Sequence, residues 1–299
     1  MSAIVTVREV SKRYGSAVAL DGVTFSLREN TIYGLLGRNG AGKTTLMQIV
    51  TGQGFATSGS VEVMGAAPYE NDIVLSDVCF VKESQRYPDA FKVHHALSAA
   101  ALLFPNWDET FAQSLVDDFH LPRKRGVRKL SRGMVSALGV VIGLASRARL
   151  TLFDEPYLGL DAAARQLFYD RLLADYAEHP RTVVLSTHLI DEVADLIEHV
   201  LVLDRGRLVV DDDAERLRGQ IVTVTGPAAA VDSFAGARKE LHRVQLGAVA
   251  RATVRGGVDA DTRALAAELG LEVEPVSLQQ LVIRLTGANG AEPSKEMSR

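Results

Sequence analysis

Two stretches of the chain carry residue types at a spacing that suits phosphate chemistry. The first, GRNGAGKTT (residues 37–45), fits the pattern G-x-x-x-x-G-K-[ST] and lies between a strand-like apolar run and a helix. Glycines let backbone N–H groups surround phosphate oxygens, and the helix N-terminus adds a favourable dipole. Lys43 would place its charge on the β- and γ-phosphates, and Thr44 would offer a hydroxyl to Mg²⁺. The stretch predicts a nucleoside-triphosphate loop; the alternative is a glycine-rich turn that fits by chance.

The residues expected to contact the nucleotide through this loop are Gly37, Arg38, Asn39, Gly40, Ala41, Gly42, Lys43, Thr44 and Thr45. The second stretch, KLSRGMVSAL (residues 129–138), places Ser131 and Gly133 two positions apart ahead of a small-residue helix. A hydroxyl, an N–H group and a helix N-terminus at one turn also suit an anion. One nucleotide held by the first loop does not by itself explain this second turn.

Acidic residues and a histidine follow two further apolar runs. In LTLFDEP (residues 150–156) the run buries a strand, so Asp154 and Glu155 emerge at its carboxyl end, where open α/β sheets bind ligands. Asp154 is expected to hold Mg²⁺, and Glu155 to orient or deprotonate the attacking water. His188 ends the run TVVLSTH, where it would reach a γ-phosphate. A lone histidine is ordinarily structural, but this position favours a catalytic or sensing role.

The elements that must position these residues alternate between strand and helix. Continuous apolar strands separated by helices are typical of an α/β domain with a largely parallel sheet. Residues from about 89 to 145 have a helical texture and are expected to form an insertion in that domain. After the acidic segment 211–219, expected to be a turn, residues 220–287 predict a small α+β appendage. The polar residues 288–299 predict a disordered tail.

The order and spacing of GRNGAGKTT, LSRGM, FDEP, LGLD and STH resemble those of the ATP-binding subunits of ABC transporters. The resemblance covers roughly residues 3–219 and implies a P-loop NTPase core with an N-terminal antiparallel β portion and a helical insertion. It also implies ATP and Mg²⁺ as cofactors. By the same resemblance Tyr14 stacks on adenine, Asp161 is an acid near a dimer seam, and His188 is a switch histidine. Tyr14 has an alternative interpretation as an edge-strand aromatic.

Two motifs depart from the family pattern. The first is the second turn, which in the family usually reads Leu-Ser-Gly-Gly-Gln. Here Arg132 and Met134 replace the third and fifth residues, whereas Ser131 and Gly133 are kept. The family's metal-contacting glutamine is replaced by Glu83, which follows the run DVCFV, and Gln85 lies two residues later. We expect Glu83 to be the Mg²⁺ ligand. The departures resemble bacterial export-type subunits that pair with separately encoded permeases.

Composition limits the alternatives. Among 299 residues, 33 Lys and Arg face 37 Asp and Glu, a net charge of −4 that disfavours a general nucleic-acid binder. The basic segment 122–129 is interpreted as a solvated loop. One cysteine, Cys79, excludes a disulfide within the chain and is expected to be a buried core residue. With no signal peptide evident, these features indicate the cytoplasm. No apolar run reaches the ~20 residues of a spanning helix, so any membrane span would belong to another subunit.

The sequence therefore predicts an ATP-hydrolysing subunit that drives a separate integral-membrane permease, with export the favoured direction. Its implied partners are that permease and a second ATPase subunit, a second copy or a close paralogue, bound head to tail so that each second turn contacts the other subunit's γ-phosphate. The expected location is the inner face of the cell membrane, and no nucleic-acid partner is expected. The alternative is a soluble ABC-type ATPase acting on nucleic acid or ribosomes, and a third possibility is a small-molecule P-loop kinase. The cargo stays open.

Overall fold

A computed structural model describes the chain except for residues 1–2, 84, 220, 237, 258–259 and 288–299, so the expected tail lies outside the described residues. The chain forms two compact units, Met1–His188 with Leu196–Asp211, and Leu189–Asp195 with Asp212–Arg299. The sequence-based boundary after residue 219 falls later than this division. The structure also corrects the turn expected at residues 211–219. A helix begins at Ala214, because the Asp213 carboxylate accepts hydrogen bonds from the N–H groups of Glu215 and Arg216 (3.0 and 3.2 Å).

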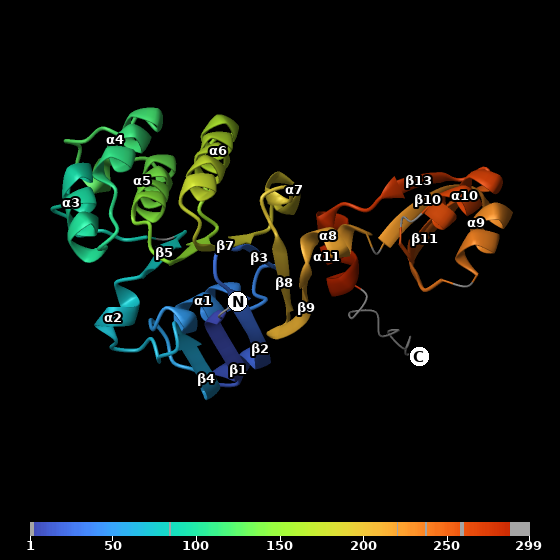
Figure 1. Cartoon of the computed structure of the whole chain (residues 1–299), viewed down its shortest axis with the longest axis horizontal. Helices are drawn as coiled ribbons and strands as arrows, with labels where there is room; N and C mark the ends of the chain where they lie inside the picture. Colours follow the sequence, from blue (N-terminus) through green and yellow to red (C-terminus); the bar gives the residue numbers. More distant parts are fainter. Residues whose placement is uncertain (1–2, 84, 220, 237, 258–259, 288–299) are drawn as a thin grey trace, which may run out of the picture. The chain divides into compact units, whose positions relative to one another are not determined.

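The first unit contains most of the elements in Figure 1. In chain order they are β1 (Ala3–Tyr14), β2 (Ala17–Arg28), β3 (Ile32–Leu36), α1 (Lys43–Val50), β4 (Ser58–Val63), α2 (Asp72–Leu75), β5 (Val78–Lys82), α3 (Val93–Leu103), α4 (Glu109–Asp118), the 3₁₀ turn η1 (Val127–Lys129), α5 (Arg132–Ala145), β6 (Leu150–Asp154), α6 (Ala162–Glu178), β7 (Thr182–Thr187), β8 (His199–Asp204) and β9 (Arg207–Asp213), whose last two residues belong to the second unit.

The central sheet of this unit has six strands in the order β5-β6-β7-β3-β8-β9. The neighbours from β5 to β8 pair in parallel, as the continuous apolar strands predicted. All five residues of β3 and of β6 are buried, because the sheet is covered on both faces. Strands β6, β7 and β3 are direct neighbours, so the carboxyl ends that carry the acids, the histidine and the phosphate loop meet at one edge.

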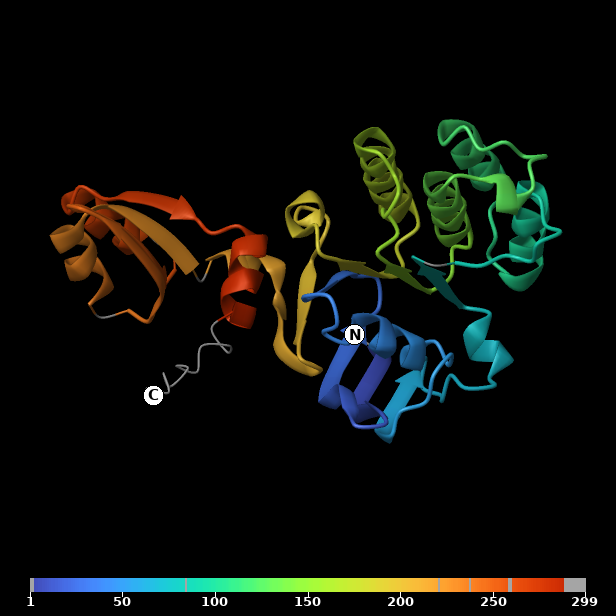
Figure 2. The same cartoon turned by 180° about the vertical axis from the view of Figure 1, so that it is seen from behind.

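A second, antiparallel sheet of order β2-β1-β4 packs over one face of the central sheet, with α1 between them (Figure 1; Figure 2). Leu46, Met47 and Val50 of α1 are at most 3% exposed and share one core with side chains of both sheets. Helix α1 is therefore buried on two sides, which fixes the direction of its N-terminus and hence of the phosphate loop. The predicted α/β fold with an N-terminal antiparallel portion is confirmed.

Helices α3, α4 and α5 form the helical insertion predicted for residues 89–145. Asp108 caps α4 by accepting a hydrogen bond from the N–H of Phe111 (2.7 Å). Helix α5 approaches the sheet closely at two glycines. A Cβ at Gly139 would lie 2.9 Å from Val81, and one at Gly143 would lie 2.5 Å from Phe153. Glycine costs roughly 1 kcal/mol inside a helix, and this contact of α5 with β5 and β6 is the reason for its use.

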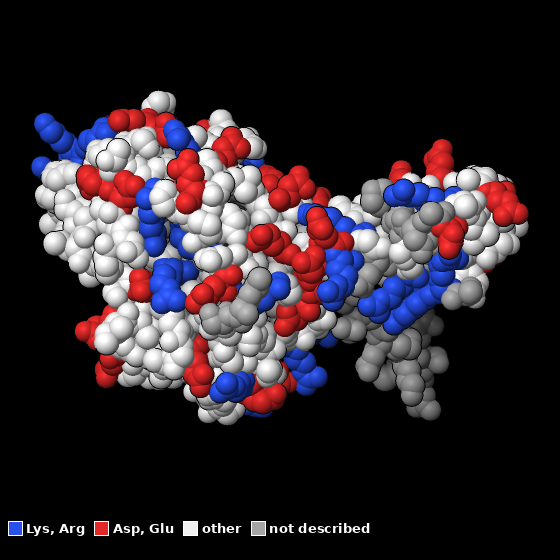
Figure 3. Space-filling model, viewed as in Figure 1, with Lys and Arg blue, Asp and Glu red and all other residues white. Residues whose placement is uncertain are grey.

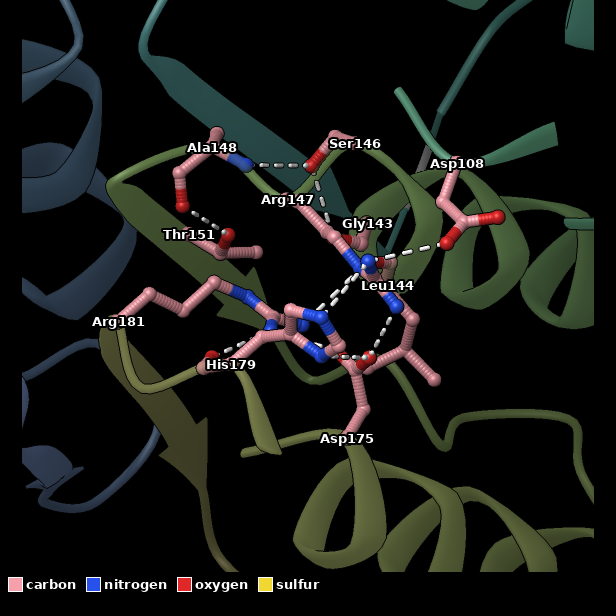
Figure 4. Close-up of polar contacts among 10 residues, drawn as sticks. All are labelled: Asp108, Gly143, Leu144, Ser146, Arg147, Ala148, Thr151, Asp175, His179 and Arg181. Atoms are coloured by element: carbon pink, nitrogen blue, oxygen red, sulfur yellow. Dashed lines mark hydrogen bonds and ion pairs between the residues drawn. The ribbon is translucent and has the colours of Figure 1, made fainter. Parts of the chain in front are cut away.

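A cluster of charged side chains ties the insertion to the sheet core (Figure 4). Asp175 of α6 is 3% exposed at its side chain and accepts from Arg181 (2.5 Å), which precedes β7, and from Arg147 (3.0 Å), which follows α5. Arg147 also reaches the α4 cap, Asp108, at 2.9 Å, and Arg181 donates to the carbonyl oxygen of Leu144 (3.3 Å). Two guanidinium groups and two carboxylates thus join α4, α5, α6 and β7.

The second unit is built on its own core. Its elements are α7 (Ile190–Val193), α8 (Ala214–Gly219), β10 (Ile221–Pro227), α9 (Ala228–Ala235), β11 (Glu240–Leu246), β12 (Val249–Arg255), α10 (Ala260–Glu268), β13 (Glu272–Pro275) and α11 (Leu278–Gly287). Strands β10 to β13 form an antiparallel sheet of order β11-β12-β10-β13 in a β-α-β-β-α-β arrangement. This is the small α+β appendage that the sequence predicted.

Within the part of the chain that the structure describes, no helix combines the length and the apolar character required to cross a bilayer.

Candidate functional site

Two glycines of the loop between β3 and α1 leave no room for a side chain. A Cβ on Gly37 would lie 2.3 Å from the carbonyl oxygen of Leu203, and one on Gly42 would lie 2.5 Å from that of Ala19. Gly42 is also the N-cap of α1, with φ of 108° and no side chain to cap the helix. The first N–H groups of α1 are thus left to an external anion, as expected of a phosphate loop.

Lys43 is the first residue of α1 and is 7% exposed. Its ammonium donates to the carbonyl oxygen of Gly37 (2.7 Å) and lies 3.8 Å from Oε1 of Glu155. Burial lowers the pKa of Lys43, while the carboxylates of Glu155 and Asp154 act in the opposite direction. The charge is therefore held in place by the loop itself, ready to receive phosphate oxygens.

Asp154 and Thr44 lie together beneath this loop. The Thr44 hydroxyl donates to Oδ2 of Asp154 at 2.6 Å, and Asp154 is 4% exposed. Its other oxygen, Oδ1, is buried and accepts no hydrogen bond from any described residue. A buried carboxylate oxygen left in this way fits a cation-bound water or a cation. No group of three acidic, histidine or cysteine side chains placed to hold a metal ion occurs among the described residues.

Glu155 occupies an unusual backbone position at the end of β6. Its φ is 51°, in the left-handed region, and its N–H donates to the carbonyl oxygen of Ser186 on β7 (3.1 Å). Oε2 of Glu155 lies 2.7 Å from Nδ1 of His188 and also accepts from the Tyr157 hydroxyl. The two side chains expected to handle water and γ-phosphate are thus in direct contact, because β6 and β7 are adjacent.

These residues surround a cleft of about 410 Å³. Its lining residues are Ala19, Asn39, Gly40, Ala41, Gly42, Lys43, Thr44, Thr45, Glu83, Arg132, Asp154, Glu155, Leu158 and His188. Eleven of the predicted site residues are in that set. Arg38 lines an adjoining cavity of about 480 Å³ together with His188 and Asn39. Gly37 contributes its carbonyl to Lys43, as described above.

The other predicted residues do not line the cleft. The Ser131 hydroxyl accepts from the N–H of Met134 (3.2 Å) and caps α5, and Asp161 caps α6 by accepting from Ala164 (2.8 Å). A Cβ on Gly133 would lie 2.4 Å from the carbonyl oxygen of Gly159. Each of the three residues therefore has a local structural role in the single subunit, and the LSRGM and LGLD segments are packed together.

Tyr14 lies at the end of β1 and is 54% exposed. The ammonium of Lys12 lies 4.9 Å from the centre of its ring. The structure thus leaves much of the ring accessible, but does not include it in the lining of the cleft. Its stacking on a base stays a prediction.

Glu83 and Gln85 lie at different sites. Glu83 lines the nucleotide cleft and pairs with Arg132 at 2.6 Å, whereas Gln85 lines a separate apolar groove. Glu83 is therefore at the nucleotide cleft and Gln85 is not, and the role of Glu83 as a Mg²⁺ ligand stays a prediction.

Sequence reasoning did not assign four residues to the site. Arg132 departs from the family pattern and was not predicted to line the nucleotide cleft of its own subunit, although it does so. Leu158 and Ala19 line the cleft without any chemical signature that a sequence displays. Tyr157 contacts both Glu155 and His188, and its only signal was its place directly after the Pro156 that follows the two acids.

Comparison with known proteins agrees with this geometry. The family model described as "ABC transporter" matches residues 20–158. The Nod factor export ATP-binding protein I of Ralstonia nicotianae is 31% identical over 72% of this chain and 68% of its own length. ABC transporter ATP-binding protein YtrB of Bacillus subtilis is 24% identical over 74% and 76%. The bacitracin transport ATP-binding protein BcrA of Bacillus licheniformis is 28% identical over 73% and 72%.

Among solved structures, an ATP-binding subunit of an ABC transporter superposes with a TM-score of 0.65 at 22% identity, covering 72% of this chain and 92% of that one. This likeness supports the fold, and the residues matched by the family model span both phosphate turns and the acids. The relatives and the phosphate loop, acids and histidine at one sheet edge lead to one conclusion: the chain belongs to the ATP-binding proteins of the ABC transporter family and is an ATPase.

Proposed function

We propose that the chain hydrolyses MgATP between two head-to-tail subunits and thereby drives a separate membrane permease, in the direction of export. The observation that carries the hydrolytic part is the position of Glu155. Its carboxylate lies 3.8 Å from Lys43 and 2.7 Å from His188, and it directly follows the Asp154 that bonds Thr44. Phosphate binding, metal binding and water activation are thereby assigned to neighbouring groups at one edge of the sheet.

Each of these residues has a separate task in hydrolysis. Lys43 and the N–H groups of α1 bind the β- and γ-phosphates. Thr44 and Asp154, with Glu83 nearby, would hold Mg²⁺, which neutralises charge on the phosphate oxygens. Glu155 orients the attacking water and accepts its proton, and His188 contacts the γ-phosphate. The buried setting strengthens these interactions, since water is largely excluded from Lys43, Asp154 and Glu155.

The head-to-tail dimer answers the question raised by the second phosphate turn. Ser131 and Gly133 do not line the cleft of their own subunit, although Arg132 between them does. A turn with a hydroxyl at a helix N-terminus and no phosphate of its own suits the γ-phosphate of a second copy or a close paralogue. ATP would then join the two subunits, and its hydrolysis would release them. This closing and opening of the dimer would drive the conformational change of the permease.

A groove beside the helical insertion supports the permease as partner. It has a volume of about 470 Å³ and is lined mainly by apolar side chains, among them Phe80, Phe91, Leu103 and Ile142. Leu103 of α3 is 67% exposed. An exposed apolar groove close to Glu83, which follows β5, suits the binding of a short cytoplasmic helix of a membrane protein. This partner would hold the chain at the inner face of the cell membrane.

The charge distribution favours a protein partner over nucleic acid. Basic and acidic side chains alternate over the first unit on the face in Figure 3. Within the segment expected to be a basic loop, Arg123 pairs with Asp117 (2.8 Å) and Arg128 with Asp89 (3.3 Å). Export is proposed because relatives carry the names of Nod factor export proteins, and the cargo is left to the permease.

The proposal is tested by purifying the tagged chain from membranes and identifying coeluting polytopic proteins by mass spectrometry. Leu103→Glu should lose the coeluting permease while ATP hydrolysis by the purified chain persists. Leu102→Glu is the matched control, because Leu102 is 89% exposed, adjacent in sequence and not part of the groove. The permease assignment fails if no polytopic protein coelutes with the wild-type chain, or if both variants lose it equally.

A further inference from the structure

Tyr157 is a buried side chain in the loop that follows the two acids. It is 3% exposed, and its hydroxyl lies among three residues from two strand ends. It donates to Oε2 of Glu155, and it accepts from the Thr187 hydroxyl (2.8 Å) and from the backbone N–H of His188 (3.1 Å). Glu155 follows β6, Thr187 is the last residue of β7, and His188 follows β7. One hydroxyl therefore joins the ends of both strands.

The direction of each hydrogen bond follows from the groups involved. A backbone N–H can only donate and an ionised carboxylate can only accept. The hydroxyl of Tyr157 must therefore use its single proton for Glu155 and its lone pairs for Thr187 and His188. Burial raises the pKa of Tyr157, and so does the hydrogen bond to Glu155, so the proton stays on the hydroxyl.

The same reasoning sets the state of the His188 ring. Nδ1 lies 2.7 Å from Oε2 of Glu155 and 3.2 Å from the Tyr157 oxygen. Because the carboxylate accepts only, Nδ1 carries a proton and donates it to Glu155. The ring centres of Tyr157 and His188 are 5.8 Å apart. Glu155 Oε2 thus receives two hydrogen bonds, while its Oε1 is the oxygen nearer Lys43.

Glu155 needs such support, since its left-handed φ of 51° is unfavourable for a residue with a side chain. We propose that Tyr157 is a positioning residue for ATP hydrolysis, holding the Glu155 carboxylate and the start of the His188 segment in one fixed arrangement. This rests on the proposed role of Glu155. Misplacement of a reacting group costs up to about 100-fold in rate, so loss of the hydroxyl should lower kcat without weakening ATP binding.

The test is Tyr157→Phe in the full chain, with steady-state hydrolysis and equilibrium binding of ATP measured on the same preparation. We expect kcat to fall about 10- to 100-fold, while KM and the binding constant for ATP change less than about two-fold. Tyr33→Phe is the matched control. Tyr33 is 1% exposed and its hydroxyl also accepts from a backbone N–H, that of Arg28 (2.7 Å), but at the amino end of β3.

A double variant separates positioning from general loss of structure. If Tyr157 acts through its neighbours, Tyr157→Phe should lower kcat much less in a His188→Ala background than in the wild type. Unchanged or raised kcat in Tyr157→Phe overturns the inference, as does a parallel loss of ATP binding and thermal stability beyond that of Tyr33→Phe. If Glu155→Gln hydrolyses ATP as fast as the wild type, the proposed function is wrong instead. Failure of the inference about Tyr157 and failure of the proposed function therefore give different results.

Discussion

Arg132 and Glu83 form an ion pair at the nucleotide cleft, with 2.6 Å between Nη2 and Oε1. They are the two cleft residues that depart from the family pattern, and they are each other's partner. Their side chains are 67% and 44% exposed, so the pair contributes little to folding stability. Its consequence is functional, because the carboxylate expected near Mg²⁺ is already bound to a cation in the single subunit.

This pairing predicts how metal dependence responds to substitution. Glu83→Ala should raise the Mg²⁺ concentration needed for half-maximal ATP binding, because a carboxylate near the metal is lost. Arg132→Ala should lower it, because Glu83 is released. Gln85→Ala is the control, since Gln85 lines the separate groove. The measurement is a magnesium titration of ATP binding, with hydrolysis as a second readout. A shift of the midpoint in Gln85→Ala alone would contradict the assignment of Glu83 as the Mg²⁺ ligand.

Glu155→Gln should separate ATP binding from hydrolysis. The substitution keeps the size of the side chain and removes its negative charge, while Lys43, Thr44 and Asp154 still hold the nucleotide. We expect turnover to fall by about 10²–10⁴ with ATP binding retained. Near-normal hydrolysis by a rigorously purified variant would show that another residue is the base.

The second phosphate turn is tested through dimerisation. In sedimentation experiments, Glu155→Gln should be monomeric without nucleotide, form a dimer with ATP and remain monomeric with ADP. Adding Ser131→Asp should abolish this dimer while ATP still binds, because a carboxylate repels the γ-phosphate of the other subunit. Aspartate caps helices as well as serine, so the end of α5 is preserved. Substituting Gly133 is less informative, since any side chain there meets the backbone of Gly159.

The buried ion cluster should be important for stability. Asp175→Asn keeps the shape of the side chain but leaves the guanidinium of Arg181, 4% exposed, without its charged partner. We expect a loss of about 3–5 kcal/mol in the free energy of unfolding, measured by urea denaturation. Asp117→Asn, which breaks the exposed pair with Arg123, should leave the midpoint nearly unchanged. Equal effects of the two substitutions would argue against the cluster as the link between insertion and core.

Cys79 provides a prediction for alkaline pH. Burial raises the pKa of this thiol from 9.0 to about 12. Between these values the unfolded chain releases the proton and the folded chain keeps it, so stability falls as pH rises through this window, by about 1.4 kcal/mol per pH unit. Urea midpoints at about pH 8 and pH 10 should therefore diverge more in the wild type than in Cys79→Ala. An equal change of the urea midpoint in the wild type and in Cys79→Ala would indicate that the thiol is accessible in the folded state.

The sequence by itself determined the parts of this protein whose chemistry is local. The phosphate loop needs glycines followed by Lys43 within one turn of chain, and that requirement is visible in consecutive residues. The acids after β6 and the histidine after β7 were also predictable. The carboxyl ends of parallel strands lie at a common edge of the sheet. Apolar runs that end in Asp154 and His188 therefore indicate that these two residues lie near each other, without any knowledge of distances.

Only the tertiary structure decided which side chains from different segments make contact. The bond between Tyr157 and Glu155 depends on a left-handed backbone turn, and the pair of Arg132 with Glu83 joins residues far apart in the chain. The helix that begins at Ala214, in a segment for which the sequence predicts a turn, likewise depends on capping by the Asp213 carboxylate. Such contacts form only where the spacing between elements is correct to within about a few tenths of an ångström. The packing of the whole domain sets that spacing.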